Sequence, residues 1–242
     1  MFKKMIIGLF IYIFTTFIFA KEIKVGFEKF PPLIESSKKG YTINILKEIE
    51  KISDFKFKII VMPYNRARYE LEAGNVDIIG HTPYKLETKE FYSYAQELDF
   101  KIDLKTAIFV KDKNKLKDIT KLKIGIPRGN EKFASALLGI PIEKFHLGSL
   151  ANLLKMLEAK RIDAFWFEKS STINTLKKLK IKNVFYKDLP KNMVPASLAV
   201  NKDKKGKVLR KKLESLIKKI NIKELLKSYT NYLNMPNEGV IK

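Results

Sequence analysis

The sequence predicts an α/β protein of two lobes, with a cleft between them and two strands that cross from one lobe to the other. Three observations lead to this fold class. Strand and helix patterns alternate in two separate series, and each series is typical of parallel βαβ units. An extended stretch at residues 106–111 joins the two series, and two amphipathic helices close the chain. The 242 residues, 45% of them hydrophobic, are enough to form a packed core and exclude wholesale disorder.

The first series begins with a short strand at residues 22–25, which Gly26 ends. Pro31 and Pro32 then require a loop, because two successive prolines cannot continue a strand ladder. The next elements follow from apolar residues at helical spacing and from β-branched or aromatic runs. They alternate as helix, strand, helix and strand at 43–52, 57–61, 66–73 and 76–79.

The second series repeats this rhythm, beginning with a strand at 123–126 and a glycine-containing turn. Asn130 and Ser149 are expected to cap the two helices that follow, because both residue types favour helix N-termini. The remaining strands and helices are predicted from the same patterns. They lie at 162–167, 170–179, 184–186, 196–200, 209–220 and 225–233.

The two closing helices have no strands of their own to cover, so we expect them to return to the first lobe through the strand at 196–200. This gives a first lobe of residues 21–108 plus 198–242 and a second lobe of residues 109–197. A cleft between lobes is the usual place for a ligand, and hinge closure around that ligand is the expected motion.

Residues 1–20 have the pattern of a cleavable signal peptide. Lys3 and Lys4 precede an apolar run at 5–19, and Ala20 marks the expected cleavage site. The alternative is a permanent membrane anchor, but the run is shorter than the roughly 20 residues that a spanning helix needs. We therefore expect a mature protein of residues 21–242, exported to the periplasm.

The composition excludes several chemistries. The chain has no cysteine, which excludes disulfides, thiolate metal sites, a cysteine nucleophile and a bacterial lipid anchor. Its two histidines, His81 and His146, are far apart, which excludes a metal site with three or more histidines. No cofactor motif occurs, so we expect neither a metal site nor a cofactor. The net charge of +22 comes mainly from dispersed lysines, with only five arginines. Nucleic-acid sites usually favour arginine with interleaved aromatic residues, so we expect a solvated lysine-rich surface and no nucleic-acid partner.

Four segments, in order, carry a resemblance to a known family. They are Ile23-Lys-Val-Gly26 with Phe30-Pro-Pro-Leu33, Leu71-Glu-Ala-Gly-Asn-Val-Asp77, Lys123-Ile-Gly-Ile-Pro-Arg-Gly129, and Leu157-Glu-Ala-Lys-Arg-Ile-Asp-Ala164. Together these segments resemble the periplasmic solute-binding proteins of polar amino-acid ABC importers, which have the type II periplasmic binding protein fold. The resemblance covers residues 22–230. It implies a monomeric, non-enzymatic protein that captures a small polar solute, an amino acid or a related amine or acid, and delivers it to a membrane permease.

The resemblance also implies where the solute binds in the first lobe. Glu28 and Phe30 match the loop that lines the family's cleft, and Tyr64 matches a second aromatic residue that opposes Phe30. Two flat rings would sandwich the apolar part of a solute, although ordinary core packing is the alternative for both. Further candidates for the cleft wall are Arg66, Thr82 and Tyr84, with His81 as a lining residue without a catalytic role.

The second lobe is expected to supply the remaining contacts. The turn Arg128-Gly129-Asn130 offers backbone N–H groups at a helix start, which attract anions, and Arg128 adds a charged fork. A solvated surface arginine is the alternative. Glu168 stands where the family usually has an aspartate that pairs with the ligand's α-amino group, and a surface glutamate is the alternative there.

One departure bears on the ligand. The family grips the α-carboxylate with an arginine, but Thr88 stands at that position, and no arginine occurs from 69 to 127. Lys85 or Lys89 would replace it only as a point charge. Two other functions therefore stay open: a dehydratase-like periplasmic enzyme on the same fold, or a sensor or interaction module that has lost amino-acid binding. The chain has no Gly-x-Ser-x-Gly nucleophile elbow, so we expect no catalytic residues.

Overall fold

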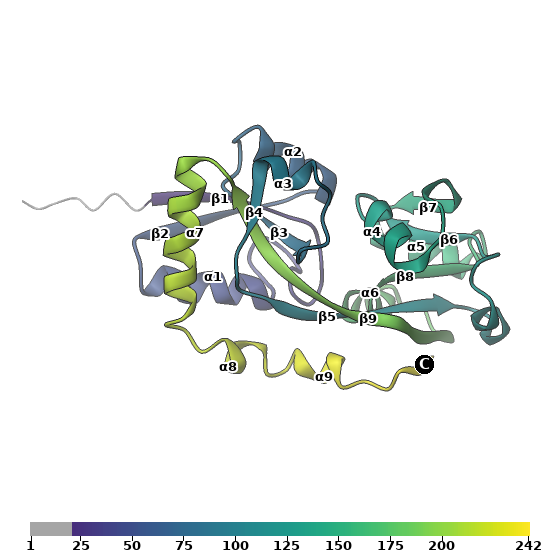
Figure 1. The fold of residues 1–242 in the computed structure, drawn as a ribbon. Coiled ribbons are helices and arrows are strands. Elements are labelled where there is room, and N and C mark those ends of the chain that lie inside the picture. Colours follow the sequence, from purple (N-terminus) through teal and green to yellow (C-terminus); the bar gives the residue numbers. More distant parts are fainter. Residues whose placement is uncertain (1–20) are drawn as a thin grey trace, which may run out of the picture.

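Two α/β lobes, connected by two long strands, make up the protein (Figure 1). The structure is a computed structural model and describes residues 21–242. The first lobe contains three parallel strands and one short antiparallel strand, namely β1 (Lys21–Phe27), β2 (Phe55–Val61), β3 (Ile78–Pro83) and β4 (Ala95–Glu97). Its helices before the crossing strands are α1 (Tyr41–Lys51), α2 (Tyr64–Glu72) and α3 (Phe91–Tyr94).

The second lobe repeats the arrangement. Its parallel strands are β6 (Ile124–Pro127), β7 (Phe145–Gly148) and β8 (Ala164–Glu168). Its helices are α4 (Glu131–Leu138), α5 (Leu150–Glu158) and α6 (Lys169–Leu179), and short 3-10 turns occupy Lys113–Lys117 and Ile142–Lys144. The strand β7 was not predicted.

The crossing strands are β5 (Ile102–Val110) and β9 (Val184–Asn201), which pair antiparallel to each other. β9 also pairs with β3, and β5 pairs with β8, so one mixed sheet runs through both lobes in the order β2-β1-β3-β9-β5-β8-β6-β7. The predicted two-lobe α/β fold with two crossing strands is therefore confirmed.

β9 corrects one detail of the prediction. We expected two separate strands at 184–186 and 196–200, but the structure has one strand of 18 residues. The register shifts between Lys105 and Ala107, and residues 189–192 have no partner there on β5. Pro190 and Pro195 interrupt the strand pattern in the sequence, whereas in the structure the pairing of β5 with β9 on both sides of 189–192 keeps the strand continuous.

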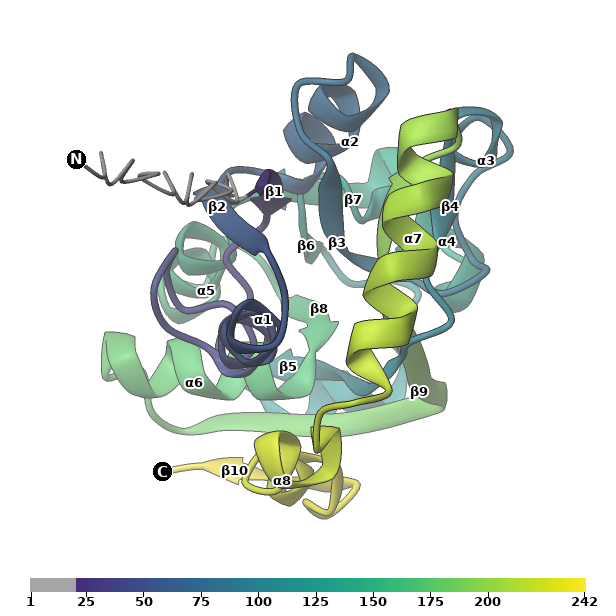
Figure 2. The same ribbon diagram turned by 90° about the vertical axis from the view of Figure 1, so that its left-hand side faces the viewer.

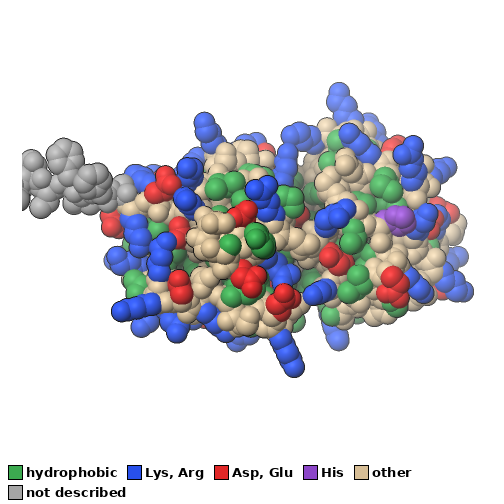
Figure 3. All heavy atoms as spheres, turned by 90° about the horizontal axis from the view of Figure 1, so that it is seen from above, with side chains coloured by type: hydrophobic (Ala, Val, Ile, Leu, Met, Phe, Trp, Pro, Cys, Tyr) green, Lys and Arg blue, Asp and Glu red, His purple; other side chains and the backbone are tan. Residues whose placement is uncertain are grey.

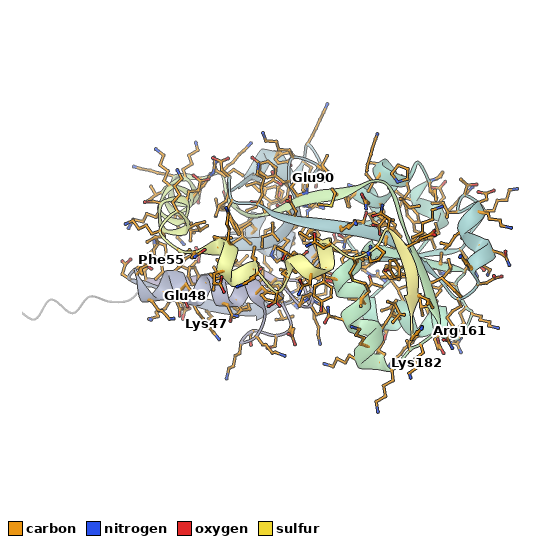
Figure 4. All side chains as sticks on the ribbon, turned by 90° about the horizontal axis from the view of Figure 1, so that it is seen from below. Lys47, Glu48, Phe55, Glu90, Arg161 and Lys182 are labelled. Atoms are coloured by element: carbon orange, nitrogen blue, oxygen red, sulfur yellow. The ribbon has the colours of Figure 1, made fainter. Side chains whose placement is uncertain are left out.

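The chain ends in a segment that crosses the underside of the molecule. It consists of α7 (Lys204–Ile217), α8 (Ile222–Leu226), α9 (Thr230–Leu233) and β10 (Glu238–Ile241). Figure 2 shows α7 beside the first lobe, and Figure 4 shows the later elements running from the half that carries Lys47 and Glu48 to the half that carries Arg161 and Lys182.

The predicted single helix at 225–233 is thus two short helices, and β10 was not predicted. β10 pairs antiparallel with β9, with Glu238 opposite Lys187 and Ile241 opposite Val184. The exact boundaries of the two lobes stay a prediction.

The sequence pattern of each helix explains how it packs. Ile43, Leu46 and Ile49 of α1 recur at the helical period and are each at most 1% exposed, so that face of α1 is buried against the sheet. Lysine and arginine side chains are spread over the face in Figure 3, among acidic and hydrophobic side chains.

The predicted signal peptide at 1–20 lies outside the described residues. Across 21–242, the helices are too short or too polar for any of them to cross a bilayer.

Candidate functional site

A cavity of about 760 Å³ lies between the two lobes. Its first wall is the loop after β1 together with the end of β2, including Glu28, Lys29 and Met62. Its second wall comes from the other lobe and includes Arg128, Leu150 and Lys178. The carboxyl ends of parallel strands are where ligands usually bind in α/β folds, and the loop after β1 and the end of β2 belong to that edge.

The loop after β1 is closed by its own backbone. The N–H of Phe30 donates to the carbonyl of Ile34 at 2.9 Å, and the N–H of Ile34 donates back at 2.7 Å. This tight closure places Glu28, Lys29 and Pro31 together on the cavity wall.

Glu28 is the titratable group that the cavity changes most. Its side chain is half-buried, and desolvation raises the pKa of the Glu28 carboxyl to about 8. A hydrogen bond with the side chain of Asn130, on the second lobe, lowers this pKa only in part. At neutral pH the Glu28 carboxyl is therefore mainly protonated and able to donate a hydrogen bond into the cleft.

Phe30 makes a contact between the lobes. Its ring meets the ring of Phe167, on β8, edge to face at a centroid distance of 5.2 Å. On its other side it lies 5.7 Å from the ring of His81. Phe30 therefore packs in a core that both lobes share, at one side of the cavity.

Tyr64 lies apart from Phe30, in the small core under α2. Its hydroxyl donates to Glu87 at 2.5 Å, and burial and the neighbouring carboxylate raise its pKa. The structure thus does not bring Phe30 and Tyr64 together as opposing rings, and their roles toward a solute stay predictions.

An arginine does reach the segment where the family's arginine is missing, but it comes from α2. Arg68 lies 3.8 Å from the Glu87 carboxylate and contacts the hydroxyl of Thr88 at 3.5 Å. Its guanidinium also lies over the ring of Phe91. Glu87 balances this charge inside the first lobe. Arg66, in contrast, is exposed and pairs with Glu70 on the same helix.

Thr82 and Tyr84 are placed along β3 and just after it. Thr82 is fully buried, and its hydroxyl donates to Glu97 at 3.1 Å. Tyr84 lies beneath two lysine ammonium groups, those of Lys85 and Lys101, at 5.3 and 4.9 Å from its ring centre. Neither residue lines the cavity.

His81 has few polar contacts. Its Nε2 lies 2.8 Å from the Thr42 hydroxyl, and its ring stacks on Phe27. Its Nδ1 is buried and has no hydrogen-bond partner within the described residues 21–242. Burial lowers the pKa of His81 to about 4, so its ring is neutral at physiological pH.

Glu168 caps α6. Its carboxylate accepts hydrogen bonds from the backbone N–H groups of Ser170 and Ser171, at 2.9 and 2.6 Å, and from the Ser170 hydroxyl at 2.8 Å. Burial still raises its pKa, because the side chain is only 3% exposed. The carboxylate predicted to bind a ligand amine is thus used to begin a helix.

The glycine turn of the second lobe faces α2. Gly129 has a φ of 100°, and a Cβ at this position would lie 2.8 Å from the Asn65 side-chain oxygen. Its N–H donates to the Glu131 carboxylate at 2.6 Å, so that N–H is already satisfied. Asn130 donates to the carbonyl of Pro127, whereas Arg128 is exposed and lines the cavity.

Of the predicted site residues, the cavity therefore includes Glu28 and Arg128, with Asn130 beside Glu28. Sequence reasoning missed Lys29, Met62, Leu150 and Lys178 as lining residues. Lysines are so common in this chain that nothing in the sequence marks Lys29 or Lys178.

Comparisons with known proteins agree with the fold. No protein-family profile and no curated protein matches the sequence. Among solved structures, a histidine kinase sensor domain with similarity to periplasmic binding proteins has a TM-score of 0.73 and 16% identity, over 93% of this chain and 99% of that chain. The substrate-binding protein of an amino acid ABC transporter has a TM-score of 0.71 and 23% identity, over 87% and 100%.

An ancestral arginine-binding protein bound to arginine is similarly close, with a TM-score of 0.71 and 20% identity over 86% of this chain and 97% of that chain. Identities this low establish the fold. The protein thus has the two-lobe fold that amino-acid importer binding proteins share with this sensor domain, and the predicted resemblance is confirmed at that level.

Proposed function

We propose that the chain is an exported binding protein that captures a small polar solute between its lobes and delivers it to an ABC-type permease. The observation that carries this proposal is the cavity of about 760 Å³ whose walls come from both lobes. A solute in that cavity contacts both walls at once, so it stabilises the closed arrangement of the lobes. The similarity to the binding protein of an amino acid transporter supports the same role.

In this proposal residues 1–20 direct export and are then removed, and the mature protein acts in the periplasm as a monomer. It carries no cofactor and performs no reaction. Glu28 and Arg128 are the leading ligand-binding residues, because both line the cavity.

Blocking the cavity tests the proposal. Ala151 lines the second wall, so Ala151→Trp fills part of the cavity, whereas Ala136→Trp adds the same ring at an exposed position on α4. Thermal unfolding is measured against a panel of amino acids, amines, dicarboxylates and short peptides, after the protein has been unfolded and refolded to remove carried ligand. A solute at a hundred times its Kd stabilises by about 2.7 kcal/mol, which is roughly 5–11 °C for a chain of this size.

We expect a solute that stabilises the wild type and the Ala136→Trp variant but not the Ala151→Trp variant. Equal stabilisation of all three proteins would place the binding site elsewhere. A panel without any stabilising solute, together with a cooperative melt, would contradict the transport role.

A second candidate function is a sensor domain that responds without an amino acid. Two observations favour it: Phe30 and Phe167 already close one side of the cleft, and Glu168 is engaged as a helix cap. The similarity to a histidine kinase sensor domain also supports it. The solute panel distinguishes the two functions.

A further inference from the structure

The charge of the cavity indicates what kind of solute it accepts. Three cationic side chains line it, and they come from both walls: Lys29 from the first lobe, and Arg128 and Lys178 from the second. Within residues 21–242, none of the three has a carboxylate within salt-bridge distance. All three are exposed to the open space of the cleft.

The carboxyl groups of the cavity do not cancel this charge. Glu35 is paired with Lys39 at 2.8 Å. Glu28 is mainly protonated at neutral pH, since burial raises its pKa to about 8. The cavity is therefore positive at neutral pH, with cationic side chains on both of its walls.

The rest of the lining indicates size and shape. Val61, Met62 and Pro31 give the first wall an apolar surface, and Leu150 and Leu179 do the same for the second. The volume of about 760 Å³ lies within the roughly 300–1,000 Å³ range of pockets that enclose drug-sized ligands. A solute that is larger than a single amino acid and has a short apolar part fits this space.

At the start of α4, side chains are the groups available to bind an anion. The N–H of Gly129, which a phosphate would need at the start of α4, already donates to Glu131 at 2.6 Å. The planar guanidinium of Arg128 matches a carboxylate in bidentate geometry, and the two lysines provide mobile charges on either side.

We propose that the solute is an acid of about dipeptide size that carries two or more carboxylates, held between Lys29 on one lobe and Arg128 and Lys178 on the other. This inference rests on the proposed function and names the solute class of the same cavity. Such an anion contacts cations of both lobes at once, so its binding favours closure of the lobes.

Three dipeptides of similar size and different charge test the inference: Glu-Glu, Gln-Gln and Lys-Lys. Their binding to protein produced from the full chain is measured by isothermal titration calorimetry at pH 7 and at low and high salt. Lys178→Met removes one cation of the cavity, and Lys177→Met, next to it on α6 but outside the cavity, is the matched control.

We expect Glu-Glu alone to bind and its Kd to rise with salt. Losing one charged contact should raise that Kd about tenfold in Lys178→Met and leave it unchanged in Lys177→Met.

The outcomes separate the two proposals. Binding of Gln-Gln or Lys-Lys in preference to Glu-Glu would overturn the acidic solute class and leave the binding function standing. Equal weakening in the Lys177→Met variant would show that only the general surface charge attracts acids, which also overturns the inference. A folded protein that binds none of the three dipeptides overturns the inference, and the wider solute panel then decides whether the binding function fails with it.

Discussion

Glu28 shows how one side chain connects the cavity to the stability of the protein. The folded state raises the pKa of Glu28 to about 8 because the carboxyl is desolvated between the lobes. In the unfolded chain this group titrates near 4.5. The folded state thus binds this proton more tightly. The stability that Glu28 contributes is complete below the unfolded pKa and is lost as the pH rises through about 8.

Replacing Glu28 with glutamine should therefore change the pH dependence of unfolding. We expect Glu28→Gln to match the wild type near pH 4 and to be more stable at pH 9. The difference should be about 1–2 kcal/mol, or several degrees in Tm, because solvent around the half-buried carboxyl reduces the full effect of the pKa shift. The midpoints come from thermal unfolding followed by circular dichroism. Glu35→Gln, at the same cavity but paired with Lys39, is the control and should differ equally from wild type at both pH values. A pH-independent difference for Glu28→Gln would show that its carboxyl is solvated.

Other residues show that a polar group can match a ligand-binding position and still serve the fold. Glu168 bonds to two backbone N–H groups of α6, which satisfies donors that every helix start leaves open. Gly129 gives its N–H to Glu131. Neither group is free to bind a solute unless these bonds are exchanged.

At the scale of elements, a buried ion cluster fastens the C-terminal segment to the crossing strands. Asp188 of β9 lies 2.8 Å from the ammonium of Lys169 and 2.9 Å from that of Lys105. The same two lysines donate to the end of the chain: Lys169 to the carbonyl of Pro236 at 2.7 Å, and Lys105 to the side chain of Asn237 at 3.0 Å. The N–H of Asp188 also donates to the carbonyl of Asn237 at 2.6 Å.

The C-terminal segment contacts both lobes. Tyr229 packs on Tyr41 of α1 with ring centres 6.0 Å apart, and the hydroxyl of Tyr232 lies 3.3 Å from Asn174 of α6. Beyond them, β10 adds a strand to the sheet. The segment thus lies along the crossing strands and joins the two lobes through these contacts.

Removing the charge of Asp188 should detach this segment. Asp188→Asn leaves two buried ammonium groups without their counter-ion, and breaking such a cluster costs about 3–5 kcal/mol. We expect a drop of this size in the free energy of unfolding, and faster hydrogen exchange at 230–242 than elsewhere. Glu158→Gln, which breaks the more exposed pair with Lys111, is the control and should cost less than about 1 kcal/mol. Similar costs for the two variants, with unchanged exchange at the C-terminus, would refute the anchoring role.

Across the whole molecule, the lobes touch beside the cavity at several points: Phe30 meets Phe167, Gly129 lies against Asn65, and Asn130 makes a hydrogen bond with Glu28. The lobes of Figure 1 are therefore in direct contact, and we expect them to separate about the crossing strands.

A double-mutant cycle measures the aromatic contact. Phe30→Leu and Phe167→Leu are made singly and together, and their stabilities are compared by urea unfolding. Edge-to-face rings in contact should show a coupling energy of about 0.5–1.5 kcal/mol. Additive effects would mean that the rings are apart in solution and that the lobes rest open; small-angle scattering of the wild type would then give a larger radius of gyration than this structure.

The local pattern of the sequence was sufficient to predict the fold. Strand and helix periods are set by which residues face the core, so the two βαβ series could be predicted from one chain. Long-range pairing could not be predicted this way. β9 pairs with β5 along most of its length, and β10 is a strand because the end of the chain returns to β9.

Local sequence patterns thus indicate the two lobes, their order along the chain and two residues of the cavity wall, Glu28 and Arg128. The tertiary structure alone decided the partner of Tyr64, since Glu87 lies 23 residues further along the chain, whereas Glu168 and Gly129 find their partners two or three residues away. It also decided that Lys29 and Lys178 face one cavity from opposite lobes. The charge of that cavity results from residues far apart in the chain, and so only the folded arrangement could show it.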